Sequence, residues 1–167
     1  MRTLYLIRHA KSSKDDPSLK DFDRPLNARG ERTAPFMAQM FLHRNEAVDL
    51  LVSSPALRAL QTAQFFATTL SVPHDRITQD REIYLAGVED LMSVVNGLPD
   101  GAQRVMIFGH NPGFTELLEH LCHATAGDLP TCGMARIDLN ARRWQDVKAG
   151  TGSLAWLDLP RQHAGIA

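Results

Sequence analysis

Short apolar runs and longer amphipathic stretches alternate along most of the 167-residue chain. Continuous apolar runs of roughly 4–8 residues are typical of strands buried on both faces, whereas apolar positions spaced three or four apart are typical of helices. The runs predict strands at residues 3–8, 49–53 and 104–109, and weaker patterns predict further strands at about 76–79, 134–139 and 153–159. The spaced patterns predict helices at residues 27–44, 55–70, 88–97 and 113–124.

The order of these elements determines the fold class. Strands that alternate with helices predict a mostly parallel sheet, because the connecting helices cover both of its faces. We therefore expect an α/β three-layer sandwich with a mostly parallel central sheet and helices on both faces. The length suits a single domain, which we place at residues 1–160, followed by a frayed C-terminal tail at residues 161–167.

Prolines interrupt the pattern at two places. Residues 10–25 are polar and contain Pro17 and Pro25, so they predict a long loop after the first strand. Pro35 lies inside the helical stretch 27–44. Because proline removes a helical hydrogen bond, it predicts a kink or a late helix start there.

Composition changes this picture mainly by exclusion. The net charge of −1 gives no basic face for nucleic acid. No apolar run approaches the roughly 18 residues that cross a bilayer, and the chain opens on a strand rather than an apolar signal region. We therefore expect a cytoplasmic protein without a nucleic-acid or membrane partner. Cys122 and Cys132 form no CxxC pair, and we expect no disulfide in a reducing compartment.

Basic side chains follow three of the predicted strands. Arg8 and His9 come at the end of the first strand, Arg58 lies early in the helix after the second, and His110 follows strand 104–109. Ligands of open α/β sheets bind outside the carboxyl ends of the strands, so we expect these four side chains to converge. Two arginines and two histidines suit a dianionic phosphoryl group, which arginine can bind with two hydrogen bonds.

Two of the strand ends also carry a capping residue followed by proline. These pairs are Ser54-Pro55 and Asn111-Pro112. Such pairs are typical of helix starts, so they predict that two helices point their positive ends toward the same edge. We therefore add Asn111 to the candidates for substrate contact.

Three stretches of this chain resemble one known family. LIRHAKS, SSPALRALQTA and VMIFGHNPG are similar to motifs of the histidine phosphatase superfamily, whose fold is phosphoglycerate-mutase-like. RPLNARG, EIYLAGVEDLM and the short length resemble its SixA-type phosphohistidine phosphatase branch. The resemblance covers about residues 2–159. The superfamily usually has Arg-His-Gly where this chain has Ala10 in third place, so the backbone there must accept a β-carbon.

The resemblance implies a two-step phosphatase mechanism. His9 would be the nucleophile that forms a phosphohistidine intermediate, which water then hydrolyses. Arg8, Arg58 and His110 would hold the phosphoryl oxygens and balance the charge of the transition state. The scheme requires no metal and no other cofactor. Because His9 must be neutral and His110 works better protonated, we expect a bell-shaped pH–rate profile.

The proton donor stays open at this stage. The superfamily uses a carboxylate, and Glu82 lies near the matching position, with Asp80 as a possible substitute. The alternative interpretation of Glu82 is a surface residue at a strand end. A phosphohistidine substrate would need little help, because imidazole, with a pKa of about 6.5, leaves more easily than an alkoxide.

The loop after the first strand supplies further candidates for substrate contact. The resemblance places this loop along the mouth of the site, and the candidates are Lys11, Ser12, Arg24 and Asn27. For Lys11 and Arg24 the alternative is a solvated loop charge. The same loop carries Asp15, Asp16, Asp21 and Asp23, whose spacing fits no calcium loop.

Four functions fit these residues to different degrees. We favour a phosphatase that acts on phosphohistidine in a protein, such as a histidine phosphotransfer domain, because the short chain leaves little room for substrate-covering segments. A small-molecule phosphomonoesterase of the same superfamily is the main alternative, and a mutase fits the length less well. A non-catalytic phosphate-binding or phosphoprotein-binding module would be expected to lack one of the four basic residues, and all are present.

Overall fold

In the computed structural model, which describes residues 1–166, strand β1 (Arg2–Arg8) lies inside a six-stranded sheet. The strand order is β3-β2-β4-β1-β5-β6. The other strands are β2 (Leu50–Ser53), β3 (Thr78–Gln79), β4 (Arg104–Gly109), β5 (Met134–Leu139) and β6 (Gly152–Asp158). Only β5 runs against the others, since it pairs antiparallel with both β1 and β6. The predicted mostly parallel sheet is confirmed.

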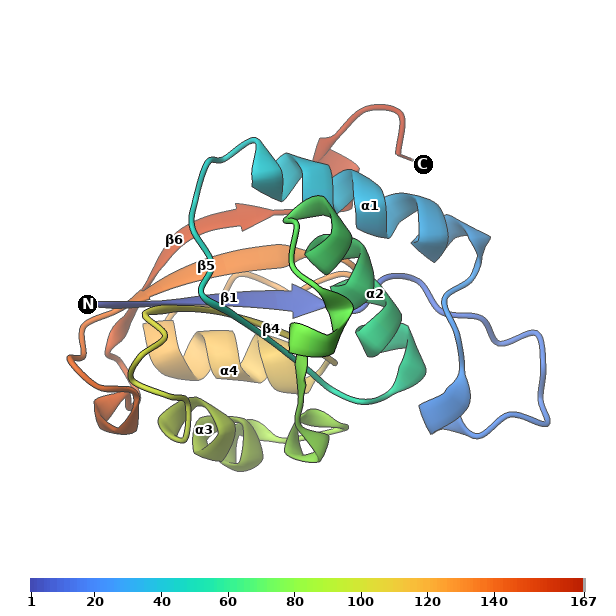
Figure 1. Cartoon of the computed structure of the whole chain (residues 1–167). Helices are drawn as coiled ribbons and strands as arrows, with labels where there is room; N and C mark the ends of the chain where they lie inside the picture. The colour runs from blue at the N-terminus through green and yellow to red at the C-terminus, as the bar shows by residue number, and fades with distance from the viewer. Residues whose placement is uncertain (167) are drawn as a thin grey trace.

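Helices cover both faces of this sheet (Figure 1). Helices α1 (Ala28–Leu42) and α2 (Leu57–Thr69) pack on one face, and α3 (Val88–Asn96) and α4 (Gly113–Cys122) pack on the other. Leu4 and Leu6 of β1 join the core under α3 and α4, whereas Tyr5 and Ile7 join the core under α1 and α2. Because side chains of a strand alternate between faces, a strand between two helical layers must be apolar throughout. The three-layer α/β sandwich is confirmed.

Short 3₁₀ helices connect several of these elements. They are η1 (Asp21–Asp23), η2 (His74–Arg76), η3 (Arg81–Ile83), η4 (Trp144–Asp146) and η5 (Pro160–Gln162). The predicted long loop therefore contains η1, and residues Ser12 and Leu26 form an isolated bridge near its two ends.

Two helix starts differ from their predictions. Helix α2 begins at Leu57 and not at residue 55, and its N-cap is Ala56 without a side-chain cap. The backbone N–H of Ser54 donates to Phe108 at 3.0 Å, and its hydroxyl accepts the Ala56 N–H at 3.2 Å, so residue 54 belongs to the sheet edge and to the turn before the helix. Of the two alternatives at Pro35, the late start is wrong, because α1 begins at Ala28, one residue after the predicted start, and continues through Pro35.

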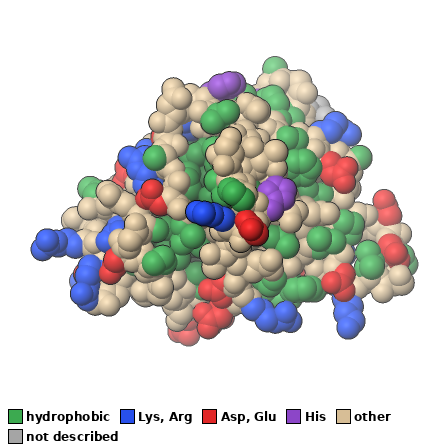
Figure 2. All heavy atoms as spheres, in the orientation of Figure 1, with side chains coloured by type: hydrophobic (Ala, Val, Ile, Leu, Met, Phe, Trp, Pro, Cys, Tyr) green, Lys and Arg blue, Asp and Glu red, His purple; other side chains and the backbone are tan. Residues whose placement is uncertain are grey.

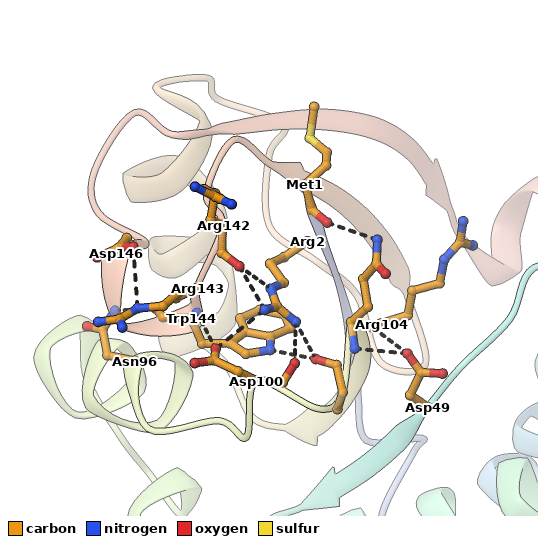
Figure 3. Close-up of polar contacts among 12 residues, drawn as sticks. Met1, Arg2, Asp49, Asn96, Asp100, Arg104, Arg142, Arg143, Trp144 and Asp146 are labelled. Carbon is orange, nitrogen blue, oxygen red and sulfur yellow. Dashed lines mark hydrogen bonds and ion pairs between the residues drawn. The ribbon is translucent and has the colours of Figure 1, made fainter.

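At the amino end of β1, the Arg2 side chain is hydrogen-bonded to backbone carbonyls (Figure 3). Nε and Nη2 of Arg2 donate to the Arg142 carbonyl at 3.0 and 2.7 Å, and Nη1 donates to the Asp100 and Ala102 carbonyls at 2.9 and 3.1 Å. The guanidinium lies 5.8 Å from the ring centre of Trp144, which is fully buried. Arg2 therefore has an acceptor for each of its side-chain nitrogens and serves the fold.

The last described residues return to the sheet. The His163 ring nitrogen lies 2.5 Å from the Asp158 carboxylate, and its ring lies edge-on to Phe36 at 5.6 Å. Fraying of residues 161–167 stays a prediction, and Ala167 lies outside the described residues.

Surface charge is mixed on the face shown in Figure 2, where basic and acidic side chains are interspersed. This distribution agrees with the net charge of −1. Within residues 1–166, no helix combines the length and apolar character needed to cross a membrane.

Candidate active site

The order of the strands places the candidate residues side by side. Strand β4 lies between β2 and β1, so His110 after β4 lies between His9 after β1 and Ser54 after β2. The His9 backbone N–H donates to Gly109 at 3.0 Å, which fixes the two strand ends in register. The structure thus brings the ends of three parallel strands to one edge, as expected for an α/β ligand site.

A cavity of about 240 Å³ lies at this edge. All four of the predicted basic residues line it. The lining residues are Arg8, His9, Lys11, Ser12, Lys14, Arg24, Arg58, Leu85, His110, Asn111 and Thr131. No carboxylate lines the cavity within the described part of the chain. Such a concentration of one sign of charge favours an anionic ligand.

His9 presents one free ring nitrogen. Its Nδ1 lies 2.7 Å from the Ala10 carbonyl, so Nδ1 carries the proton and Nε2 keeps its lone pair. Burial lowers the pKa of His9 to about 4; the Ala10 hydrogen bond opposes this shift, and the Arg58 and Arg8 guanidiniums add to it. His9 is therefore neutral near pH 7, which is the form that can attack phosphorus.

His110 faces His9, with 5.3 Å between the ring centres. Its Nε2 lies 2.8 Å from the Ser54 hydroxyl, and its Nδ1 is buried without a partner among residues 1–166. Burial, then the neighbouring His9 and Arg58, lower the pKa of His110 to about 3. His110 is neutral in the free site, so the proton expected for it must arrive with the phosphoryl group.

Two arginines at the cavity have incomplete hydrogen bonding. Arg8 Nη1 donates to the Leu129 carbonyl at 3.0 Å, and Arg58 Nη1 donates to the Asp21 carbonyl at 2.7 Å. The Nε atoms of both are buried without an acceptor. With His110 Nδ1, they are the buried side-chain nitrogen and oxygen atoms left unpaired in residues 1–166. Each such donor costs about 1–3 kcal/mol, which a bound anion would offset.

Asp21 holds these groups together, and the sequence analysis assigned it no role in the site. Its carboxylate accepts hydrogen bonds from Arg24 at 2.8 Å, Arg58 at 3.0 Å and the Tyr84 hydroxyl at 2.6 Å. Burial acts to raise the pKa of Asp21, but hydrogen bonds from Tyr84, Arg24 and Arg58 outweigh it and hold that pKa well below its usual range. The Tyr84 ring lies edge-on to His110, with centres 5.5 Å apart. Asp21 therefore ties the long loop to the site.

Comparison with known proteins agrees with this arrangement. A family model described as histidine phosphatase superfamily (branch 1) matches residues 4–100. The chain belongs to this superfamily. It is a phosphatase by family, and its fold is phosphoglycerate-mutase-like.

The chain is also similar to three individual proteins. A structure from Agrobacterium tumefaciens, provisionally assigned as the phosphohistidine phosphatase SixA, shares 31% identity with a TM-score of 0.79, covering 95% of this chain and 98% of that one. The protein histidine phosphatase SixA complexed with tungstate has a TM-score of 0.82 and 23% identity, covering 96% and 98%. An uncharacterized chloroplastic protein from Arabidopsis thaliana is 29% identical over 168 residues, 93% of this chain and 74% of that protein.

The loop candidates of this superfamily member divide into two groups. Lys11, Ser12 and Arg24 line the cavity, and Arg24 Nη1 donates to the Ser12 hydroxyl at 3.2 Å. Asn27 is not among the lining residues. Its side-chain oxygen instead accepts the Gly30 N–H at 2.9 Å, so Asn27 caps helix α1.

Asn111 lines the cavity, but its amide is used within the fold. Its Oδ1 accepts from the Thr115 N–H at 3.1 Å and from the Thr115 hydroxyl at 3.0 Å. Its Nδ2 donates to the Leu129 carbonyl at 2.8 Å. Asn111 thus caps the first turn of α4 and holds the segment whose carbonyl also accepts from Arg8.

The structure does not bring Glu82 to the cavity. Glu82 is exposed and, with Asp80, lines a separate cavity of about 380 Å³ beside the edge strand β3. The Asp80 carboxylate accepts the Glu82 N–H at 2.9 Å, which fixes the turn η3. That turn directs Tyr84 and Leu85 toward the site instead.

Lys14, Leu85 and Thr131 also line the cavity and were missed by the sequence analysis. Thr131 arrives through the chain before β5, where the Cys132 N–H donates to the Arg8 and His9 carbonyls at 3.0 Å. No motif marks this contact, because it depends on β5 pairing with β1. Lys14 could have been found by its place in the same basic loop as Lys11.

Proposed function

We propose that this protein hydrolyses phosphohistidine on another protein, such as a histidine phosphotransfer domain, through a covalent intermediate on His9. One observation carries the proposal. Arg8 Nε, Arg58 Nε and His110 Nδ1 are buried donors or acceptors without partners, and they belong to three residues that share a cavity with the neutral His9. A tetrahedral phosphoryl group offers the oxygens that such groups need.

The first chemical step is attack by His9. Its Nε2 lone pair forms a bond to phosphorus while the bond from phosphorus to the substrate nitrogen breaks. The electron pair of the broken bond stays on the substrate ring, which is protonated at its other nitrogen and leaves as neutral imidazole. The His9 ring becomes positively charged, and the Ala10 carbonyl at 2.7 Å from Nδ1 stabilises that charge. Arg8 and Arg58 balance the negative charge that spreads over the phosphoryl oxygens. Water then breaks the bond from His9 to phosphorus, which releases phosphate and restores the neutral imidazole.

The lining of the cavity favours an imidazole leaving group. No carboxylate lines it within residues 1–166, and both Glu82 and Asp80 line a different cavity. An alkoxide leaving group needs a proton donor in the site, whereas a phosphohistidine ring takes up a proton on its free nitrogen at a pKa of about 6.5 and then leaves as neutral imidazole. The 31% identity to the provisionally assigned phosphohistidine phosphatase supports the same choice.

The test is phosphate release from a phosphohistidine-bearing transfer domain in the presence of EDTA. Wild type, His9→Ala and His43→Ala are compared, with p-nitrophenyl phosphate as a parallel substrate. His43 is exposed at the end of α1, so its variant controls for loss of a histidine. We expect release by wild type and His43→Ala and none by His9→Ala. Release from the small ester alone would favour the small-molecule phosphatase, and binding of phosphate without any release would mean a binding module.

A further inference from the structure

A second cavity, of about 360 Å³, adjoins the candidate active site. Lys11 and Thr131 line both cavities, so the two are neighbours along one surface. The second cavity lies between helix α1 and the C-terminal segment. Its remaining lining residues are Arg29, Thr33, Pro160, Arg161, His163, Gly165 and Ile166.

The residues that the structure describes give the second cavity a positive charge. Lys11, Arg29 and Arg161 line it, and none of them forms a salt bridge within the described residues. No acidic residue of the described chain lines the cavity. The Asp158 carboxylate, which contacts the lining residue His163, is also paired with Arg44. Cations held around a concave surface attract an anion most strongly.

Specific contacts hold the two sides of this cavity in place. A β-carbon at Gly30 would lie 2.1 Å from the Lys11 carbonyl, so α1 and Lys11 are packed as closely as glycine allows. The Lys11 carbonyl also accepts the Asn27 N–H at 3.0 Å. On the other side, the His163 contact with Asp158 holds the segment that carries Arg161. Lys11 and Arg29 therefore project from a closely packed part of the fold, and Arg161 projects from a segment that His163 holds against β6.

We propose that the second cavity binds an acidic side chain of the substrate protein, close to the phosphohistidine that occupies the first cavity. The proposal rests on the proposed function of the first cavity as a phosphoryl site. Lys11 lies between the two anions and serves both. The second cavity would then determine which phosphohistidine proteins are hydrolysed, since a protein with a neutral side chain at that place would lose the interaction.

The test compares two phosphohistidine peptides that differ only in Glu or Gln beside the phosphorylated histidine. The enzymes are wild type, the double variant Arg29→Gln with Arg161→Gln, and the control Arg32→Gln. Arg32 is exposed on the same helix and does not line the cavity. We expect wild type and the control to prefer the Glu peptide about tenfold in kcat/KM, and the double variant to treat both peptides alike. Because each enzyme is scored by a ratio, partial unfolding cannot mimic the result.

The outcomes separate this inference from the proposed function. Hydrolysis of both peptides at equal rates by wild type would overturn the second cavity as an anion site and leave the phosphohistidine activity intact. A preference that survives in the double variant would overturn it as well. If wild type releases phosphate neither from these peptides nor from the phosphohistidine-bearing transfer domain, the proposed function fails, and fructose 1,6-bisphosphate and fructose 6-phosphate serve as the next pair. A bisphosphate preference lost only in the double variant would then assign the second anion to a small substrate.

Discussion

Arg2 and Arg8 lie at opposite ends of strand β1, and their hydrogen bonds differ. Every side-chain nitrogen of Arg2 has a backbone acceptor, as Figure 3 shows for the cluster around Trp144. The Nε of Arg8 is buried without one, beside a cavity that holds several other cations. Burial alone therefore does not identify a ligand-binding arginine. The unpaired donor does, because the fold leaves it unsatisfied only where something else can bind.

The largest effects are expected when Arg8 and Arg2 are each replaced by glutamine. Arg8→Gln should lower kcat/KM for phosphate release by about 100- to 1000-fold, because it removes a cation that stabilises the transition state. Its free energy of unfolding should change by less than about 1 kcal/mol, since one of its donors was unsatisfied. Steady-state kinetics and urea unfolding measure the two quantities. An activity within twofold of wild type would contradict the assignment.

For Arg2, at the amino end of β1, we expect stability rather than activity to change. Arg2→Gln should lower the free energy of unfolding by about 2–4 kcal/mol, because the Arg142, Asp100 and Ala102 carbonyls lose a shared charged donor. The kcat/KM of the folded fraction should stay at the wild-type value. Arg142→Gln is the control, because the contacts of residue 142 with Arg2 are made by its backbone carbonyl. Equal stability of the two variants would show that the Arg2 bonds contribute little.

Asp21→Asn tests the second arginine of the site, because the Asp21 carboxylate holds Arg58 in position. The change keeps the shape but replaces an oxygen that accepts from Arg58 and Tyr84 with an amide nitrogen. We expect KM to rise about tenfold with a smaller effect on kcat, because Arg58 loses a charged hydrogen bond of about 1.5 kcal/mol. Asp23→Asn in the same turn η1 should leave KM unchanged, since Asp23 forms no salt bridge in residues 1–166. A similar KM for both variants would remove Asp21 from the site.

The fold was predictable where the pattern is local. The run at 104–109 matches β4 at both ends, because a strand buried between two helical layers is almost continuously apolar. The stretch 134–139 matches β5, where the partly buried Arg136 and Asp138 alternate with buried residues. The four basic residues of the cavity were predictable for a related reason, since the direction of parallel strands brings their carboxyl ends together. That rule separates Arg8 from Arg2 before any coordinates are seen.

Asp21, Thr131 and the position of Glu82 were not predictable in the same way. Asp21 is one of several aspartates in a loop, and only its contact with Arg58 distinguishes it. Thr131 reaches the cavity because β5 pairs with β1 from a distant part of the chain. Glu82 follows a strand, as an acid of the site would, but the turn at Asp80 directs it to another cavity. Each outcome depends on contacts between residues far apart or on the path of a turn.

The smallest expected effect concerns pH, to which only the cavity end of β1 should respond, through its two buried histidines. Burial lowers the pKa of His9 to about 4 and that of His110 to about 3, below the value of 6.5 expected in the unfolded chain. Below pH 6.5, His9 and His110 bind protons in the unfolded chain but not in the folded protein. The free energy of unfolding therefore falls as the pH falls toward 4. Above pH 7 the two histidines are neutral in both the folded and the unfolded state, so they should cause no change in the free energy of unfolding with pH.

Urea unfolding of wild type and His9→Gln at pH 5 and pH 7 measures this effect. The loss of stability between the two pH values should be smaller in His9→Gln, because one of the two depressed histidines is gone. His43→Gln, an exposed histidine, should retain the wild-type loss. An identical loss in all three proteins would show that the site histidines do not govern the pH dependence.

The most direct measurement is NMR of the arginine Nε–H groups during titration with inorganic phosphate. The account predicts that the signals of Arg8 and Arg58 shift with one common dissociation constant, because both Nε atoms lack acceptors in the free protein. The Arg2 signal should stay in place, because its Nε already donates to Arg142 at 3.0 Å. Unmoved Arg8 and Arg58 signals at saturating phosphate, or equal shifts at all three arginines, would contradict the claim that unpaired donors mark the phosphoryl site.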